Sequence, residues 1–90
     1  MNNLLNDIEF DILGAVYFVE PFEHILEECN EKTAVVADVL KQLIHKKFII
    51  PMKWDEEKKE FIRSFIYDTD DMRQYHYLAT KDGLMAHNSK

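Results

Sequence analysis

The 90-residue sequence is poor in several residue types and patterns, and each shortage excludes a class of protein. Its single cysteine excludes an internal disulfide and is typical of a reducing compartment. Two glycines and two prolines leave little room for long flexible linkers. No apolar run approaches the ~20 residues that span a bilayer, and the start MNNLLNDIEF does not resemble a secretory signal. We therefore expect one soluble, cytoplasmic domain over residues 1–90.

Basic residues are missing from the first third of the chain. Residues 1–31 contain eight acids and no lysine or arginine, and the net charge of the whole chain is −6. This charge disfavours a simple nucleic-acid binder, because phosphate affinity comes largely from lysine and arginine. Residues 32–53, however, contain five lysines and one aspartate. Such a basic segment within an acidic chain indicates a surface for a partner.

Apolar residues recur at helical spacing in three stretches and predict helices over about 4–19, 21–29 and 33–47. Asn3 or Asn6 is expected to cap the first helix, Pro21 to lie in the first turn of the second, and Thr33 to cap the third. Gly14 is interpreted as a tolerated helix glycine. The outer face of the third helix is predicted to hold Ala34, Ala37, Asp38, Lys41 and His45.

The second half alternates in the manner of strands, which are predicted over about 48–54, 60–67 and 73–79. Pro51 lacks a backbone donor, so its strand should be an edge strand or be paired only in part. Two acidic turns separate the strands, at residues 55–59 and 68–71. Thr80 is expected to cap a last short helix over about 81–87.

Three short motifs follow one another along the chain. Residues 22–46 read as two helices around a short polar connector, LKQLIHKKFII as a helix running into a strand, and YHYLATKDGLM as a strand exit with the spacing Leu-x-Thr-x-x-Gly. From about Ile8 to Ala86 the chain resembles the winged-helix domain of small prokaryotic transcriptional regulators. The resemblance implies an α+β fold, with a three-helix helix-turn-helix core, a two- to three-stranded antiparallel wing sheet and a short C-terminal helix.

The resemblance also implies a DNA-binding regulator that contacts duplex phosphates through the third helix. The residues expected on the phosphate side are Lys32, Thr33, Lys41, His45 and Lys46. The sequence departs from the family in three places. Ala34, Val35, Ala37 and Asp38 occupy the base-reading positions, Lys47 stands where glycine is common, and both candidate wing tips are acidic. The simpler interpretation of the lysines is a solvated helix face, favourable to the helix dipole.

The alternative function is a protein-interaction module on the same scaffold that has lost DNA readout. Its candidate interface is the first helix, where Phe10, Tyr17 and Phe18 exceed what a small core needs, or the aromatic sheet. The partner would be a second copy of the chain or another protein, with no membrane. The aromatic residues of the second half read as a cover for the helices rather than a stacking platform for single strands.

No pattern indicates an enzyme, a cofactor or a metal. Cys29 falls on the apolar stripe of the second helix and is expected in the core rather than as a nucleophile. The four histidines lack the close spacing of a metal site. Residues 68–71 lack the glycine and distant glutamate of a calcium loop, so a charged turn is predicted.

Overall fold

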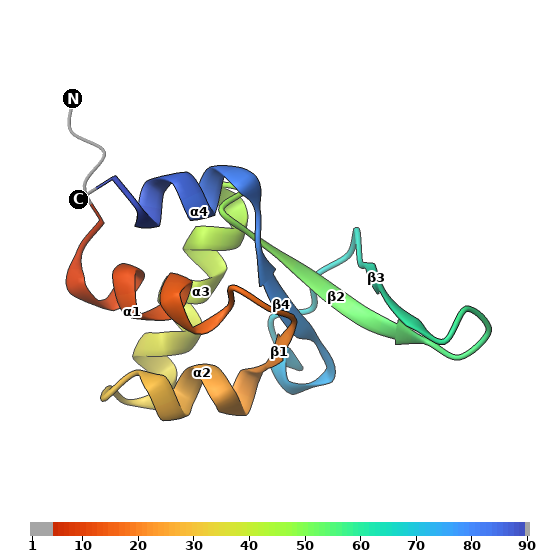
Figure 1. Ribbon diagram of the computed structural model, residues 1–90. Coiled ribbons are helices and arrows are strands. Elements are labelled where there is room, and N and C mark those ends of the chain that lie inside the picture. Colours follow the sequence, from red (N-terminus) through yellow and green to blue (C-terminus); the bar gives the residue numbers. More distant parts are fainter. Residues whose placement is uncertain (1–4, 90) are drawn as a thin grey trace.

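The computed structural model describes residues 5–89 and has an α+β fold (Figure 1), so the expected class is confirmed. In the described chain it has four α-helices, one 3₁₀ turn and a four-stranded antiparallel sheet. The sheet has more than the two or three strands expected, because the segment after the first helix pairs with the last strand. The elements are α1 (Asp7–Ala15), β1 (Glu20–Pro21), α2 (Phe22–Glu28), α3 (Thr33–His45), β2 (Ile49–Asp55), β3 (Glu60–Arg63), η1 (Met72–Gln74), β4 (His76–Ala79) and α4 (Lys81–His87).

The strands lie in the order β1–β4–β2–β3, and every pair is antiparallel. The helices gather at one end of the molecule, and the β2–β3 hairpin projects from the other (Figure 1). Pro51 lies in an interior strand, but β2 pairs with β4 only over Ile49–Met52 and with β3 only over Met52–Asp55. Of the two predictions for this strand, an edge position or partial pairing, partial pairing is therefore confirmed.

The core lies where α1, α2 and α3 meet the inner face of the sheet. Its buried apolar residues are Ile12, Leu13, Ala15, Val16, Phe22, Ile25, Cys29, Val36, Leu40, Leu43, Ile49, Tyr75, Tyr77 and Ala79. The buried positions of α3 recur at three- and four-residue spacing, as expected for a helix with one apolar face.

The first helix ends at Ala15, whereas the sequence pattern predicts about residue 19. Its cap is Asn6, which forms a reciprocal capping box with Glu9; the expected start at residue 4 lies outside the described residues. Beyond Val16 the chain is drawn into the sheet, because the Val16 carbonyl accepts the Ala79 amide at 2.9 Å and β1 pairs with β4. Such long-range pairing overrides the local helical pattern.

The start of α2 lies one residue later than predicted, and α3 begins at the predicted residue but with a different N-cap. Pro21 is the N-cap of α2 rather than part of its first turn, because it also pairs in β1. Lys32 is the N-cap of α3, and Thr33 is the first helical residue, with no side-chain cap. Thr80 caps α4 as predicted, since its hydroxyl accepts the Gly83 amide at 3.0 Å.

The third helix ends in a left-handed turn without a glycine. Lys47 has φ = 68°, in the left-handed region that glycine adopts most easily. The Phe48 amide donates to the Leu43 carbonyl and the Lys47 amide to the Ile44 carbonyl, at 2.9 and 3.0 Å, which is the Schellman pattern. The helix therefore ends at His45, before the predicted residue 47.

The turn after α3 is locked by the start of α4. The Thr80 hydroxyl donates to the Lys47 carbonyl at 2.7 Å, and the Thr80 amide donates to the Phe48 carbonyl at 2.9 Å. Gly83 passes so close that an added Cβ would lie 2.1 Å from the Phe48 oxygen. On α1, an added Cβ at Gly14 would lie 3.1 Å from His87 Nε2, so this glycine does serve close packing, contrary to the prediction.

The strands after the hairpin are shorter than predicted. β3 ends at Arg63 rather than about residue 67, and β4 begins at His76 rather than about residue 73. Between them the chain leaves the sheet, turns at residues 68–71 and forms η1.

We expect Gly83→Ala to lower the free energy of unfolding by about 2–3 kcal/mol, because the new methyl group would overlap backbone that is fixed by Thr80. Urea denaturation measures the change. Met85→Ala, at an exposed position of the same helix, is the matched control and should change stability by less than about 0.5 kcal/mol. An unaltered stability of Gly83→Ala would contradict the close approach of α4 to Phe48.

Candidate nucleic-acid and protein interfaces

The outer face of α3 holds the residues that its spacing predicts. Ala34, Asp38, Lys41 and His45 are exposed and Ala37 is half-buried, while the opposite face is buried in the core. The helix ends carry the remaining candidates for phosphate contact, because Lys32 and Thr33 lie at the N-terminus and Lys46 follows His45 at the C-terminus. The five candidates therefore share one helix but not one patch.

Two of the predicted phosphate-contacting lysines have carboxylate partners within the chain. Lys46 Nζ lies 2.9 Å from Glu9 Oε2 on α1, in a partly buried ion pair. Lys41 Nζ lies 4.0 Å from Asp38 Oδ1, one turn earlier on the same exposed face. This ion pair joins the first turn of α1 to the C-terminal end of α3, so Lys46 has a structural role that the sequence pattern does not reveal.

Glu9 is a nearly buried carboxylate with several partners. Burial alone would raise the pKa of Glu9, but the Asn6 backbone amide and the Lys46 ammonium outweigh burial and hold the pKa below its usual value. The carboxylate is therefore ionised at neutral pH. It simultaneously closes the capping box of α1 and anchors the C-terminal end of α3.

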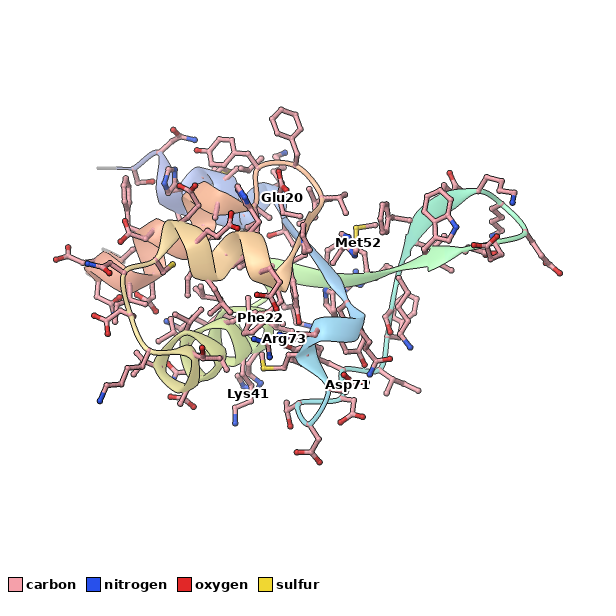
Figure 2. All side chains as sticks on the ribbon, turned by 90° about the horizontal axis from the view of Figure 1, so that it is seen from below. Glu20, Phe22, Lys41, Met52, Asp71 and Arg73 are labelled. Carbon is pink, nitrogen blue, oxygen red and sulfur yellow. The ribbon has the colours of Figure 1, made fainter. Side chains whose placement is uncertain are left out.

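The acidic turn at residues 68–71 lies against the outer face of α3. Together they enclose an open hollow of about 370 Å³, which is lined by Ala34, Ala37, Asp38, Lys41, Thr69, Asp70 and Met72. Carboxylates therefore stand on both sides of the hollow, and the alanines at its base present no hydrogen-bonding side chain. Figure 2 shows Lys41 and Asp71 on the same side of the molecule, whereas Met52 projects from the other side of β2.

Three tyrosine hydroxyl groups hold the segment that carries this turn. Tyr75 Oη accepts the Asp68 amide at 2.7 Å and donates to the Ile66 carbonyl at 3.2 Å. Tyr77 Oη donates to the Met72 carbonyl at 2.7 Å and lies 3.0 Å from Tyr67 Oη. Because Tyr77 has only one hydroxyl proton, Tyr67 is the donor to Tyr77.

Burial raises the pKa of Tyr67 to about 12 and raises that of Tyr77 further. These hydroxyl groups therefore stay protonated over the whole neutral range and keep their donors.

The 3₁₀ turn is also tied to α2. Arg73 forms an ion pair with Glu23, and its guanidinium lies 5.2 Å from the centroid of the Phe22 ring. The neighbouring labels in Figure 2 show Arg73 beside Phe22. Met72, which precedes it, packs against the core and lines the hollow. The segment after β3 is thus fixed at several points.

A second candidate surface is apolar and lies on the outer face of the sheet and the edge of β3. The outer face carries Ile50, Met52, Trp54, Phe61, His76 and Leu78, as the strand register requires. The Phe61 ring lies 5.1 Å from Trp54 and 4.5 Å from His76, centroid to centroid. Just beyond β3, Phe65 and Ile66 are 87% and 78% exposed.

Sequence reasoning missed the exposure of Phe65 and Ile66. It assigned them to the two faces of a strand, where each would be at least half covered. The sequence does contain a signal for this exposure. Residues 61–67 hold more large apolar side chains than a small sheet can bury. Contiguous exposed apolar groups of this size commonly mark interfaces.

The residues predicted for an interface on the first helix contact α4 instead, with one exception. Phe10 stacks on His87 with 4.1 Å between ring centroids, and Tyr17 Oη lies 2.6 Å from His87 Nδ1. Phe18 is 76% exposed. Phe18 follows the end of α1 and is the most exposed of the three residues, and an interface around this helix remains a prediction.

The single cysteine and the possible metal ligands are the side chains that bear on catalysis and metal binding. Cys29 is buried, as predicted, and burial raises its pKa to about 11, so its thiol is not activated as a nucleophile. Among residues 5–89, no group of three or more histidine, cysteine, aspartate or glutamate side chains is arranged to hold a metal ion. Within that range, too, no helix has the length and apolar character needed to cross a membrane.

No protein-family model matches the chain, and neither a curated protein nor a solved structure is significantly similar to it. The candidate surfaces are therefore interpreted from their own residues.

We expect Tyr75→Phe to accelerate hydrogen exchange at the Asp68 amide and to lower the free energy of unfolding by about 1–2 kcal/mol, because the amide loses its acceptor. Exchange followed by NMR measures the first effect. The control is Tyr17→Phe, which removes a hydroxyl group on the other side of the core. Unchanged exchange at Asp68 in Tyr75→Phe would show that the hydroxyl does not hold the segment.

Glu9→Gln should cost about 1–2 kcal/mol of stability at pH 7, with Glu27→Gln at an exposed position of α2 as the control. The folded-state pKa of Glu9 is lower than the unfolded value. Its contribution is therefore complete above the unfolded pKa and is lost as the pH falls through the folded pKa. Urea denaturation at neutral and acidic pH measures the difference in free energy of unfolding between the unaltered chain and Glu9→Gln. This difference should become smaller as the pH falls. An equally large difference at acidic pH would exclude the Glu9–Lys46 ion pair as its cause.

Proposed function

We propose that the chain is a protein-interaction module on a winged-helix scaffold whose third helix does not read DNA. The observation that carries this proposal is the acidic turn, which stands against the outer face of α3. In the winged-helix family this face is the one that enters the DNA groove. An approaching phosphate would therefore meet the carboxylates of Asp38 and Asp70 together with Lys41.

The residue types on this face support the same conclusion. Base edges are read by side chains with hydrogen-bonding groups, and Ala34 and Ala37 have none. The Asp38 carboxylate accepts a hydrogen bond from Gln42 Nε2 at 3.0 Å, so this amide is also engaged. Asp38 and Asp70 add repulsion within a Debye length of about 8 Å at physiological salt. Neither readout nor electrostatic attraction favours a duplex here.

The tip of the β2–β3 hairpin offers no compensating basic wing. Glu56 accepts the Trp54 indole N–H at 2.9 Å and pairs with Lys59 at 3.3 Å. Asp55 accepts the Glu57 amide at 2.9 Å. The tip is thus an internally bonded acidic turn. The exposed apolar groups lie between this tip and the core, which supports contact with a protein.

A DNA-binding transcriptional regulator with weak phosphate contacts is the second candidate. The observation that favours it is the lysine content of α3 and its ends, where Lys32, Lys41 and Lys47 are exposed. If these side chains bound a duplex, they would supply a sequence-independent and salt-dependent affinity.

Fluorescence anisotropy with a pool of random duplexes at low ionic strength separates the two candidates. We expect no binding by the unaltered chain. The double variant Asp38→Asn with Asp70→Asn should gain weak binding that falls as salt rises, and the further change Lys41→Glu should abolish it. A control with Glu27→Gln and Glu28→Gln makes the same change in net charge on α2, away from the hollow.

Binding by the unaltered chain that Lys41→Glu or Lys46→Glu weakens would overturn the proposal in favour of the DNA-binding candidate. Equal gains in the Asp38/Asp70 and Glu27/Glu28 variants would show that net charge, rather than the acidic turn, excludes DNA.

A further inference from the structure

We propose that the open edge of β3 binds a second copy of this chain, in an antiparallel pairing across a two-fold axis at Ile62. This inference rests on the proposed function as a protein-interaction module and names its partner. β3 is the end strand of the sheet, and in residues 5–89 no strand pairs with its outer edge. At the other end of the sheet, the edge strand β1 has only two residues, one of them Pro21.

The register identifies the backbone groups that face outward. The Ser64 amide donates to the Pro51 carbonyl at 2.9 Å, so the hydrogen-bonded pairs of this ladder alternate from there and include the pair of Ile62 with Lys53. The N–H and C=O groups of Ile62 therefore face β2. Those of Phe61 and Arg63 point away from β2, toward the open edge.

The spacing of these groups fits a second copy. A two-fold axis perpendicular to a sheet keeps each face continuous, so it pairs residues that lie on the same face. With the axis at Ile62, Phe61 of each copy pairs with Arg63 of the other, and both outward-facing residues exchange N–H···O=C bonds. This register therefore satisfies all the outward groups of Phe61 and Arg63.

The side chains are also complementary in this register. Ile62 meets Ile62 of the second copy on one face, which is an apolar cross-strand pair. On the other face, Arg63 meets Phe61 of the second copy. The Arg63 guanidinium already lies 5.1 Å from the centroid of the Phe65 ring in its own chain. In the pair it would lie between two aromatic rings, an arrangement favourable to a cation.

The distribution of charge favours self-association at this edge over the rest of the surface. A chain of net charge −6 repels its copies over most of its surface. From Phe61 to Tyr67, however, the one charged side chain is that of Arg63. Two copies can therefore approach here without bringing carboxylates together.

The exposed apolar area is adequate for a small interface. Phe65 is 87% exposed and Trp54 48% exposed, which leaves on the order of 300 Å² of ring surface per copy. With Ile62, Arg63 and Ile66 added, the two copies together reach the low end of specific interfaces, about 1,000 Å².

Sedimentation equilibrium of the purified full chain tests the pairing. We expect a monomer–dimer equilibrium, with an association constant that falls about tenfold or more in Ile62→Lys, because two like charges would then face each other across the axis. Thr69→Lys adds the same charge beside α3, away from the edge, and should leave the constant near that of the unaltered chain. A chain that stays monomeric at all concentrations would overturn the proposal and show that the short edge merely avoids pairing.

Disulfide trapping tests the register. In the proposed pair, the Cα atoms at position 62 are a non-hydrogen-bonded pair about 4.5 Å apart, within disulfide range, whereas those at position 63 are offset by two residues and lie more than about 7 Å apart. Ile62→Cys should therefore give a crosslinked dimer on mild oxidation, and Arg63→Cys should give little. The unaltered chain, with Cys29 buried, sets the baseline. Preferential crosslinking at position 63 would overturn the register.

Photo-crosslinking in cells separates failure of this inference from failure of the proposed function. A photoreactive phenylalanine analogue at position 65 should give an adduct of two copies of the chain, and the same analogue at Glu57 on the hairpin tip should not. An adduct with a different protein, together with a monomeric purified chain, would overturn the proposal that the partner is a second copy. The same result would support the proposed function as a protein-interaction module. No protein adduct, together with duplex binding in the anisotropy assay, would overturn both.

Discussion

Three tyrosine hydroxyl groups determine the path of the chain after β3, and both candidate surfaces depend on that path. Tyr75 binds the backbone of Ile66 and Asp68, while Tyr77 binds that of Met72 and accepts from Tyr67. The Tyr75 and Tyr77 side chains are buried in the core and that of Tyr67 packs against it, and each hydroxyl group finds a backbone or tyrosine partner, as a buried polar group must. The backbone of this segment is thus satisfied by side chains rather than by a strand ladder.

The turn between α3 and β2 is the second feature that constrains the fold. It explains why Thr80 and Gly83 stand three residues apart at the start of α4. A left-handed residue other than glycine costs about 1 kcal/mol, and Lys47 bears that cost. The surrounding bonds offset it, because Thr80 donates to the carbonyls of both Lys47 and Phe48. Gly83 then lets α4 approach the same backbone. The Thr80–Gly83 spacing, which resembles a winged-helix strand exit, is therefore explained by these contacts with the end of α3.

The sequence predicts those parts of the fold that depend on local patterns. The buried face of α3, the Asn6 and Thr80 caps and the burial of Cys29 follow from periodicity and capping chemistry. Distant partners decide the rest. The end of α1 depends on the Val16 carbonyl meeting the Ala79 amide, and the role of Lys46 depends on Glu9, 37 residues away. Neither contact leaves a local signal.

The two candidate surfaces are linked through the end of β3. If the chain continued as a strand to residue 67, as its alternation predicts, Phe65 and Ile66 would extend the sheet, and the acidic residues that follow would lie farther from α3. Instead the chain leaves the sheet after Arg63 and brings Thr69 and Asp70 to the outer face of the helix. The same departure leaves a short edge flanked by exposed apolar groups. One local change of path thus places carboxylates beside α3 and leaves apolar groups exposed beside β3.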